Sequence, residues 1–168
     1  MTGVAPRLAG GEPRDSDACL DLWTAAVAER DGLALAELPA AVRARAARKL
    51  TVPPLAWIVA RDAVDGLAGF GVVLPPGTSG DATDPADGAY LALLAVAPSA
   101  RGSGLGGRLL DAVTHAVRAA GVTSVFLNVL GSNTPARRLY ESRGWTSSGR
   151  PTRRTDTGQP VLRYTMTF

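Results

Sequence analysis

The sequence predicts a single α/β (α+β) domain with a mixed, mostly antiparallel sheet of about six or seven strands, flanked by about four helices. Two apolar segments, 55–61 and 67–74, are joined by DAVDG, whose Asp65-Gly66 pair is typical of an antiparallel hairpin. Residues 89–130 then follow the order strand, helix, strand, which places a parallel pair of strands within the sheet. The 168 residues, 46% of them hydrophobic, suffice for one core, so we expect one domain over residues 1–168.

The first third of the chain supplies a short strand and two helices. Residues 7–9 are the predicted strand, and the run from Asp15 through Ser16 to Asp17 offers N-caps to the first helix. The apolar side chains of that helix share one face, which makes the single cysteine, Cys19, a core residue rather than a nucleophile. A second, arginine-rich helix is predicted over 39–50. The connection between the helices, 30–38, is long enough to shape a pocket.

Beyond the hairpin, the residue pattern changes three times. Residues 75–88 are rich in Pro, Gly, Asp and Thr and are interpreted as a mobile surface loop. Residues 89–96 form an apolar run typical of a strand buried on both faces. A helix then continues to about Ala120, with Thr114 and His115 on its polar face, so His115 is expected in solvent rather than acting as a base. A second buried strand is predicted over 122–130.

The tail is predicted to hold a short helix, a strand from about Trp145 and a final strand over 161–168. DTGQ, residues 156–159, is expected to form the turn between the last two strands. Trp57 and Trp145 are interpreted as packing residues rather than as walls of a substrate site.

Composition argues against several functions. The net charge is +3, Lys49 is the only lysine, and aromatic residues do not interleave with the basic groups, so nucleic-acid binding is not expected. One histidine and one cysteine argue against a metal site. We expect a cytoplasmic protein without membrane contact, because no run approaches the roughly 18 apolar residues of a spanning helix and the N-terminus does not resemble a signal peptide. Two basic clusters are interpreted as solvated faces: Arg43, Arg45, Arg48 and Lys49, and Arg150, Arg153 and Arg154.

RGSGLGGRLL, residues 101–110, contains G-x-G-x-x-G but does not fit a dinucleotide site. Five residues separate its first glycine from the preceding strand, and the next strand offers Asn128 where a ribose-binding acid would lie. A phosphate loop is excluded because Gly-Lys-Ser/Thr does not follow. What remains is a turn before a helix whose free N–H groups and positive end suit a pyrophosphate, with Arg101 adding a positive charge.

Two blocks of sequence resemble the GNAT superfamily of N-acetyltransferases. LLAVAPSARGSGLGGRLL resembles its acyl-CoA-binding signature, Arg/Gln-x-x-Gly-x-Gly/Ala, through Arg101, Gly104 and Gly106. NVLGSNTPARRLYESRGW resembles its downstream motif. The resemblance implies the GNAT fold, with acyl-CoA held by the central parallel pair, and direct transfer of acetyl from acetyl-CoA to a primary amine of a small molecule or of a peptide or protein N-terminus. The alternative is a non-catalytic acyl-CoA-binding module.

The resemblance also implies cofactor-binding residues. The pantetheine arm is expected along Leu94, Ala95 and Val96, with the Val96 N–H stabilising the oxyanion. Asn133 is expected to bond the pantetheine beside Ala136, since Thr134 is the predicted N-cap of the following helix. The pyrophosphate is expected on the amides of Arg101, Gly102, Ser103, Gly104, Leu105, Gly106 and Gly107. No metal takes part, and a homodimer is left open.

Tyr140 matches the family's tyrosine that protonates the departing CoA thiolate. A phenol near pKa 10 is a weaker acid than a thiol near 8.5, so we expect a hydrogen bond to the thiolate as much as proton transfer. Packing in the core is the alternative role.

The general base is not apparent in the sequence. Asn128 occupies the place of one family glutamate, and residues 89–96 contain no carboxylate. The alternatives are an ordered water, an amine that arrives neutral, or a carboxylate of the connection, namely Glu29, Asp31 or Glu37. The resemblance places the acceptor pocket between residues 29–38 and the hairpin around Arg153 and Arg154.

Overall fold

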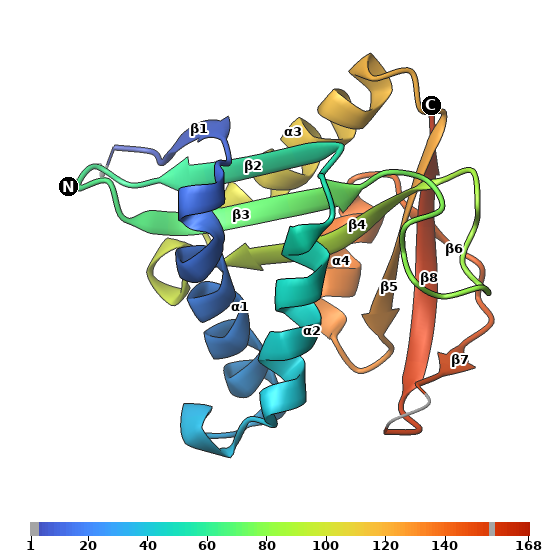
Figure 1. The fold of residues 1–168 in the computed structure, drawn as a ribbon, viewed down its shortest axis with the longest axis horizontal. Helices are drawn as coiled ribbons and strands as arrows, with labels where there is room; N and C mark the ends of the chain where they lie inside the picture. Colours follow the sequence, from blue (N-terminus) through green and yellow to red (C-terminus); the bar gives the residue numbers. More distant parts are fainter. Residues whose placement is uncertain (1–3, 155–156) are drawn as a thin grey trace.

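The computed structural model describes residues 4–154 and 157–168, which form one sheet with helices on both faces (Figure 1). The sheet has eight strands in the order β1-β2-β3-β4-β5-β8-β6, with β7 also paired to β8. Among the described strands, β4 and β5 pair in parallel and all other pairs are antiparallel. The strands are β1 (Arg7–Gly10), β2 (Ala56–Arg61), β3 (Leu67–Leu74), β4 (Ala89–Val96), β5 (Ser124–Leu130), β6 (Thr146–Ser147), β7 (Thr152–Arg153) and β8 (Pro160–Thr167).

Four α-helices flank the sheet, as predicted. They are α1 (Ser16–Asp31), α2 (Ala40–Thr51), α3 (Leu105–Ala119) and α4 (Thr134–Ser142). The mixed, mostly antiparallel fold with a central parallel pair is confirmed. The strand count exceeds the prediction because β7 is only two residues long and has no hydrophobic pattern of its own. Asp156, in the predicted turn 156–159, lies outside the described residues.

Two hydrophobic clusters hold the helices on opposite faces of the sheet. On one face, side chains of α1 and α2 pack on β2, β3 and β4, and Trp57 is packed against this cluster. On the other face, α3 and α4 cover β4, β5 and β8, with Trp145 buried among them. Both tryptophans therefore pack as predicted. Thr114 differs from the prediction: it is buried, and its hydroxyl is satisfied by donating to the Leu110 carbonyl within α3.

The start of α1 shows how a predicted cap serves two elements. Asp15 is the N-cap residue, but its side chain does not bond to the first turn of α1. One carboxylate oxygen accepts from the Glu12 N–H, and the other pairs with Arg61 of β2. Asp15 thus ties the start of α1 to the sheet through an ion pair. No helix in the described ranges is long and apolar enough to cross a membrane.

Cys19 is fully buried in the α1 face of the core, as predicted. Burial raises the pKa of its thiol to about 12, while the neighbouring Trp57 indole acts in the opposite direction. The nucleophile in alkylation is the thiolate, and a raised pKa leaves very little of it at neutral pH.

We predict that Cys19 in the folded protein reacts with iodoacetamide at pH 8 at least about 100-fold more slowly than in the unfolded chain, whose thiol has a pKa near 8.5. Mass spectrometry of samples quenched over time, with and without denaturant, measures both rates. Equal rates in the two samples would contradict the assignment of Cys19 to the core.

Candidate active site

The parallel strands β4 and β5 separate almost as soon as they pair. Only Ala89 with Val125 and Tyr90 with Phe126 are partners, and beyond these two pairs no partner joins the strands. A β-bulge at Ala92 interrupts the register between β3 and β4 on the other edge. The result is a gap in the sheet between the last six residues of β4 and the second half of β5.

The open edge of β4 carries free peptide groups. The Ala97 N–H donates to the Ala68 carbonyl, so the peptide groups of Ala97 face β3. Because the peptide groups of a strand point to alternate edges, those of Ala95 also face β3. Those of Leu94 and Val96 consequently point to the opposite edge, toward β5. Of the three strand residues assigned to the cofactor, Leu94 and Val96 can offer backbone hydrogen bonds across the gap, whereas Ala95 can contribute only its side chain.

The glycine-rich loop leads from β4 to the start of α3. Gly102 and Gly104 have φ angles of 74° and 78°, and Gly104 is the N-cap residue of α3. The first N–H groups of the helix therefore lack intrahelical acceptors and face the loop. The side chain of Leu105 is buried in the core, so only its backbone can face a ligand. The exposed Ser103 donates its hydroxyl proton to the Ala100 carbonyl at 2.5 Å.

The remaining glycines of the motif permit close packing of helices. A Cβ atom on Gly106 would lie 3.3 Å from a methyl group of Leu139 in α4. A Cβ on Gly107 would collide with the guanidinium of Arg143, which is ion-paired with Asp111 of α3. Gly107 thus contributes to α3–α4 packing whether or not its amide meets a ligand.

Arg101, at the start of the loop, is already ion-paired. Its Nη2 lies 2.7 Å from the Glu29 carboxylate at the end of α1. A hydrogen bond from Arg101 lowers the pKa of Glu29, which makes this carboxylate a weaker base. The contact joins the expected pyrophosphate loop to the connection that was expected to form a wall of the acceptor pocket.

Asn133, not Thr134, is the N-cap residue of α4, which corrects the predicted cap. Asn133 Oδ1 accepts from the Ala136 N–H at 3.4 Å, and Pro135 lies in the first turn as the second residue of the helix. The side chain of Asn133 is therefore not wholly free, although its Nδ2 hydrogens take no part in this bond. Sequence reasoning placed the cap one residue late because asparagine and threonine are both good N-caps.

Tyr140 lies on the inner face of α4 and is 8% exposed. Its ring packs against Trp145 and Tyr164, with centroids 5.9 and 5.8 Å away. Burial raises the pKa of Tyr140, so the phenol stays protonated. The neighbouring Tyr164 hydroxyl donates to Glu141 at 2.5 Å, and Arg137 donates to it at 3.3 Å. Tyr164, which the sequence did not single out, thus fixes one side of Tyr140.

Each of the three carboxylates suggested as a base has a partner. Glu29 pairs with Arg101, Asp31 pairs with Arg30 at 2.7 Å, and Glu37 accepts from the Ala34 N–H at 2.7 Å. His115 is exposed on α3, as predicted. None of these side chains stands at the β4–β5 gap as an unpaired base.

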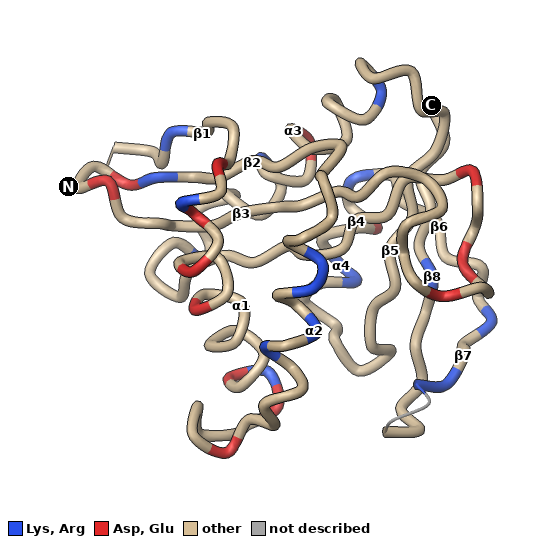
Figure 2. Tube along the Cα trace, in the orientation of Figure 1, with Lys and Arg blue, Asp and Glu red and all other residues tan. Residues whose placement is uncertain are grey.

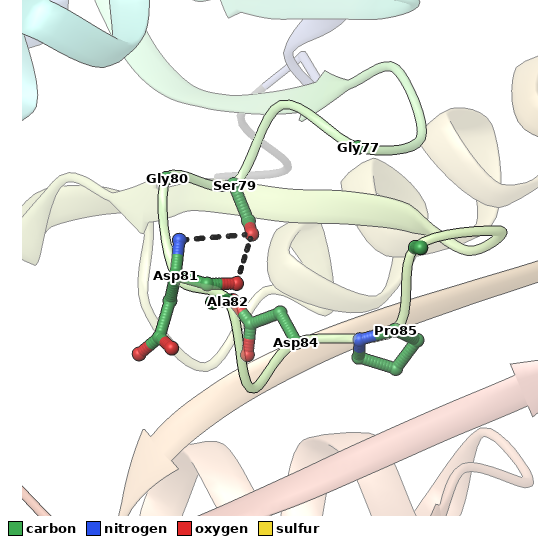
Figure 3. A pocket seen from close by; sticks show the side chains of 8 residues that line it. Gly77, Ser79, Gly80, Asp81, Ala82, Asp84 and Pro85 are labelled. Carbon is green, nitrogen blue, oxygen red and sulfur yellow. Dashed lines mark hydrogen bonds between the residues drawn. The ribbon is translucent and has the colours of Figure 1, made fainter.

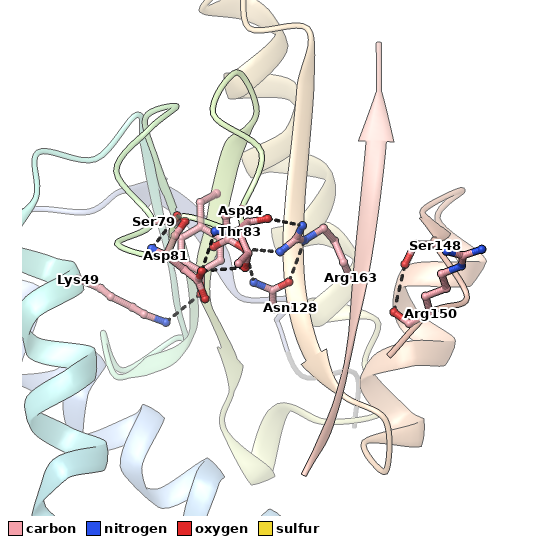
Figure 4. Close-up of polar contacts among 10 residues, drawn as sticks. Lys49, Ser79, Asp81, Thr83, Asp84, Asn128, Ser148, Arg150 and Arg163 are labelled. Atoms are coloured by element: carbon pink, nitrogen blue, oxygen red, sulfur yellow. Dashed lines mark hydrogen bonds and ion pairs between the residues drawn. The ribbon is translucent and has the colours of Figure 1, made fainter. Parts of the chain in front are cut away.

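The loop 75–88 contributes residues that the sequence analysis did not identify. The Asp84 side chain is 4% exposed and ion-paired with Arg163 of β8. Asp84 also accepts from Asn128 Nδ2 at 3.1 Å, and Arg163 Nε donates to Asn128 Oδ1 at 3.2 Å (Figure 4). The loop is thus tied to the sheet at Asp84, a contact that the prediction of a mobile surface loop did not include. No short sequence motif connects these three residues, which are up to 79 positions apart.

Lys49 approaches the same face of the sheet from α2. Its ammonium group donates to the Ala92 carbonyl at 3.1 Å, at the bulge, and to the Tyr90 hydroxyl at 3.2 Å. The Tyr90 ring stacks on the Phe126 ring, and the guanidinium of Arg163 lies over the Phe126 ring. Other charges are interspersed along the chain trace, acidic beside basic (Figure 2).

Two hollows are lined by residues of the loop 75–88 and of the α1–α2 region. One, of about 260 Å³, lies within loop 75–88 and includes Asp81 and Asp84 in its wall (Figure 3). The other, of about 250 Å³, lies between α1 and the residues that begin α2, and Leu35 and Arg43 help to line it. Its wall includes part of the connection 29–38. In the hairpin around Arg153 and Arg154, Arg153 donates to the Gly158 carbonyl at 2.9 Å. The described residues contain no group of three or more His, Cys, Asp or Glu side chains placed to hold a metal ion.

This geometry agrees with the result of comparison with known proteins. The model of the Acetyltransferase (GNAT) family matches residues 21–145. The chain belongs to the GNAT family. GNAT proteins use acetyl-CoA as acyl donor together with an acceptor substrate.

Relatives of this GNAT chain extend the comparison. A mycothiol acetyltransferase from Beutenbergia cavernae is 34% identical over 149 residues, which are 86% of this chain and 46% of the relative. The chain therefore spans about half the length of that relative. Among solved structures, a GCN5-related N-acetyltransferase from Kribbella flavida has a TM-score of 0.73 and 22% identity, covering 98% of each chain. The protein yncA from Salmonella typhimurium, solved with its cofactor acetyl-CoA, has a TM-score of 0.70 and 14% identity. The match covers 98% of this chain and 94% of yncA.

We predict that Gly104→Ala lowers the free energy of unfolding by about 1–2 kcal/mol, because alanine is strained at a φ of 78°. No atom of a non-adjacent described residue lies within 4 Å of the added methyl group, so the loss of stability would come from backbone strain and not from a steric clash. Gly10→Ala is the matched control, since Gly10 has the same free space without a positive φ. Denaturant unfolding measures both, and equal losses would refute the strain.

Proposed function

We propose that this GNAT protein transfers an acetyl group from acetyl-CoA to a primary amine of a small molecule or of a peptide or protein N-terminus. The observation that carries the proposal is a continuous track of free backbone groups. It begins at the open edge of β4, at Leu94 and Val96, and continues through the glycine loop to the start of α3. An extended donor with amides at one end and a pyrophosphate at the other matches such a track.

The residues along the track fit the parts of acetyl-CoA. The amides of the pantetheine arm can pair with the peptide groups of Leu94 and Val96, in the way an additional strand pairs with a sheet edge. The pyrophosphate suits the helix start at Gly104, where free N–H groups and the positive end of the helix dipole coincide. Arg101 adds charge there once it turns from Glu29. Asn133 can donate through Nδ2 from the far side of the gap.

Acetyl-CoA supplies the activated acetyl thioester. The Leu94 and Val96 N–H groups point into the gap and can donate to the carbonyl oxygen as its negative charge grows. Tyr140 keeps its proton because burial raises its pKa, so it stabilises the departing sulfur through a donated hydrogen bond. No covalent intermediate with the protein is needed, since the amine can attack the carbonyl directly.

The experiment that tests the proposal is release of CoA thiol from acetyl-CoA, measured against a mixed panel of amines and N-terminal peptides. We expect acceptor-dependent release, and a decrease of at least about 10-fold in kcat for Tyr140→Phe, because the variant keeps the ring but loses the donor. The Kd for acetyl-CoA, measured by calorimetry, should be nearly unchanged.

A non-catalytic acyl-CoA-binding module is the second candidate, and the presence of Asn128 in place of a glutamate favours it. Acetyl-CoA would then bind and raise the unfolding temperature, yet no amine would cause thiol release and Tyr140→Phe would have no effect on binding or release. Absence of acetyl-CoA binding would contradict both candidates.

A further inference from the structure

The side of the sheet that α1 and α2 cover is here called the acceptor face. The carboxylates near the gap on this face already have hydrogen-bond or ion-pair partners. Asp84 reaches this face from the loop 75–88, and its carboxylate is bound by Arg163 and Asn128. Glu29, at the end of α1, is bound by Arg101 of the glycine-rich loop. Asp81, also in the loop, accepts hydrogen bonds from the Thr83 N–H and hydroxyl, which lower its pKa. These carboxylates are poorly suited to take a proton from an ammonium ion.

Asn128 stands at the gap with its side chain held in one orientation. Its Nδ2 donates to Asp84 and its Oδ1 accepts from Arg163, so exchanging the two ends of the amide would break both bonds. Arg163 also donates to the Thr83 carbonyl at 3.0 Å, which fixes the guanidinium. The Asn128 side chain is nevertheless exposed, and Oδ1 keeps a second lone pair.

The backbone of Asn128 adds a second acceptor. The Phe168 N–H donates to the Thr123 carbonyl, and the Gly131 N–H donates to the Pro160 carbonyl. Odd-numbered residues of β5 therefore face β8, and the peptide groups of Asn128 face the gap. One residue thus offers two neutral oxygen atoms, Oδ1 and the backbone carbonyl oxygen, to a group that enters between β4 and β5.

The charged side chains named around this position provide no net negative charge for a cation. Arg163 of β8 is balanced by Asp84, whereas the ammonium group of Lys49 in α2 donates to two neutral oxygen atoms, the Tyr90 hydroxyl and the Ala92 carbonyl. Figure 4 shows Lys49 pointing toward the side of the sheet on which Asn128 and Arg163 meet. Lys49, Arg163, Asp84 and Asp81 together sum to no net charge, so no net negative charge among them attracts an ammonium ion.

We infer that the acceptor enters as a neutral amine, and that Asn128, oriented by Asp84 and Arg163, binds its N–H groups in place of a general base. The acceptor class this selects is an α-amino group of a peptide or peptide-like molecule rather than a lysine ε-amine. Asn128 is the contact to substrate, whereas Asp84 and Arg163 are positioning residues. The inference rests on the proposed acetyl transfer.

The reaction is balanced without a base on the protein. The lone pair of the amine attacks the thioester carbon, the C–N bond forms and the C–S bond breaks. Sulfur leaves with the bonding electron pair, and the proton lost by nitrogen equals the proton gained by sulfur. An α-amine with a pKa near 8 is roughly one-tenth neutral at pH 7, whereas an ε-amine near 10.4 is neutral in roughly one molecule in 2,500.

The first test compares two probes that each carry one amine, the tripeptide amide Ala-Ala-Ala-NH2 and Nα-acetyl-lysine amide. At pH 7 we expect kcat/KM to be at least about 20-fold higher for the tripeptide, after allowing for the greater nucleophilicity of the more basic amine. The logarithm of kcat/KM for the tripeptide should rise with unit slope and level off near pH 8. Comparable rates for both probes, turnover of neither, or a limb between pH 4 and 7 that belongs to an enzyme group would overturn the inference.

The second test uses variants in the same assay. Asn128→Leu should lower kcat/KM for the tripeptide at least about 10-fold. Asp84→Asn should also lower kcat/KM, because Asn128 then loses the carboxylate partner of its Nδ2 and is oriented by Arg163 alone. Asp87→Asn is the matched control, because Asp87 is exposed in the same loop and lies outside the set of Asp84, Arg163 and Asn128, and it should retain wild-type kinetics. A purely structural role for Asp84 would instead weaken acetyl-CoA binding and lower the unfolding midpoint together.

The two proposals fail differently. Absence of acetyl-CoA binding by the wild-type protein refutes the proposed acetyl transfer. Intact binding and turnover, with ε-amines preferred or with Asn128→Leu fully active, refutes the inference alone. If Asp84→Asn does not fold, Asn128→Leu still decides, because the exposed Asn128 side chain can change without opening the core.

Discussion

The separation of β4 and β5 after two residue pairs is the constraint on which the rest of the site depends. A sheet that loses its hydrogen bonds in the middle exposes peptide groups that otherwise would be satisfied by a neighbour. Here those groups belong to Leu94, Val96 and Asn128, so both sides of the gap offer donors and acceptors. The helix α3 spans the sheet behind the gap and starts beside its open end. One local break in strand pairing therefore produces both the track on which we propose that acetyl-CoA binds and the opening through which we propose that the acceptor enters.

The parts of this arrangement that lie close together in sequence could be predicted. The hairpin of β2 and β3 follows from two apolar runs and the Asp65-Gly66 turn, and Asp65 adopts the positive φ of 62° that such a turn uses. The β4–α3–β5 unit follows from two buried strands around an amphipathic helix. The glycine loop lies between them on the same short stretch of chain, so its position at the strand end could be predicted as well.

The acceptor face could not be predicted, because its residues meet only through folding. Asp84 lies in a loop without hydrophobic period, where the sequence gives no sign that one of its several acids is buried. Arg163 is one arginine among many, and its pairing with Asp84 depends on β8 lying beside β5. The bulge at Ala92 has no marker in an uninterrupted apolar run, yet it places the carbonyl that Lys49 binds. Short two-residue strands such as β7 are missed for a related reason, since they are defined by pairing alone.

The close contact between α3 and α4 at Gly106 and Gly107 affects how glycine-rich sequences should be interpreted. In this protein, one short glycine motif performs two unrelated tasks. Gly102 and Gly104 allow the chain to turn, and Gly106 and Gly107 clear space along a helix for Leu139 and Arg143. Because α4 also carries Tyr140, the close approach of α4 to Gly106 helps to fix where Tyr140 lies relative to α3. A glycine in this motif can therefore be required by the packing of two helices, independently of any contact with a phosphate.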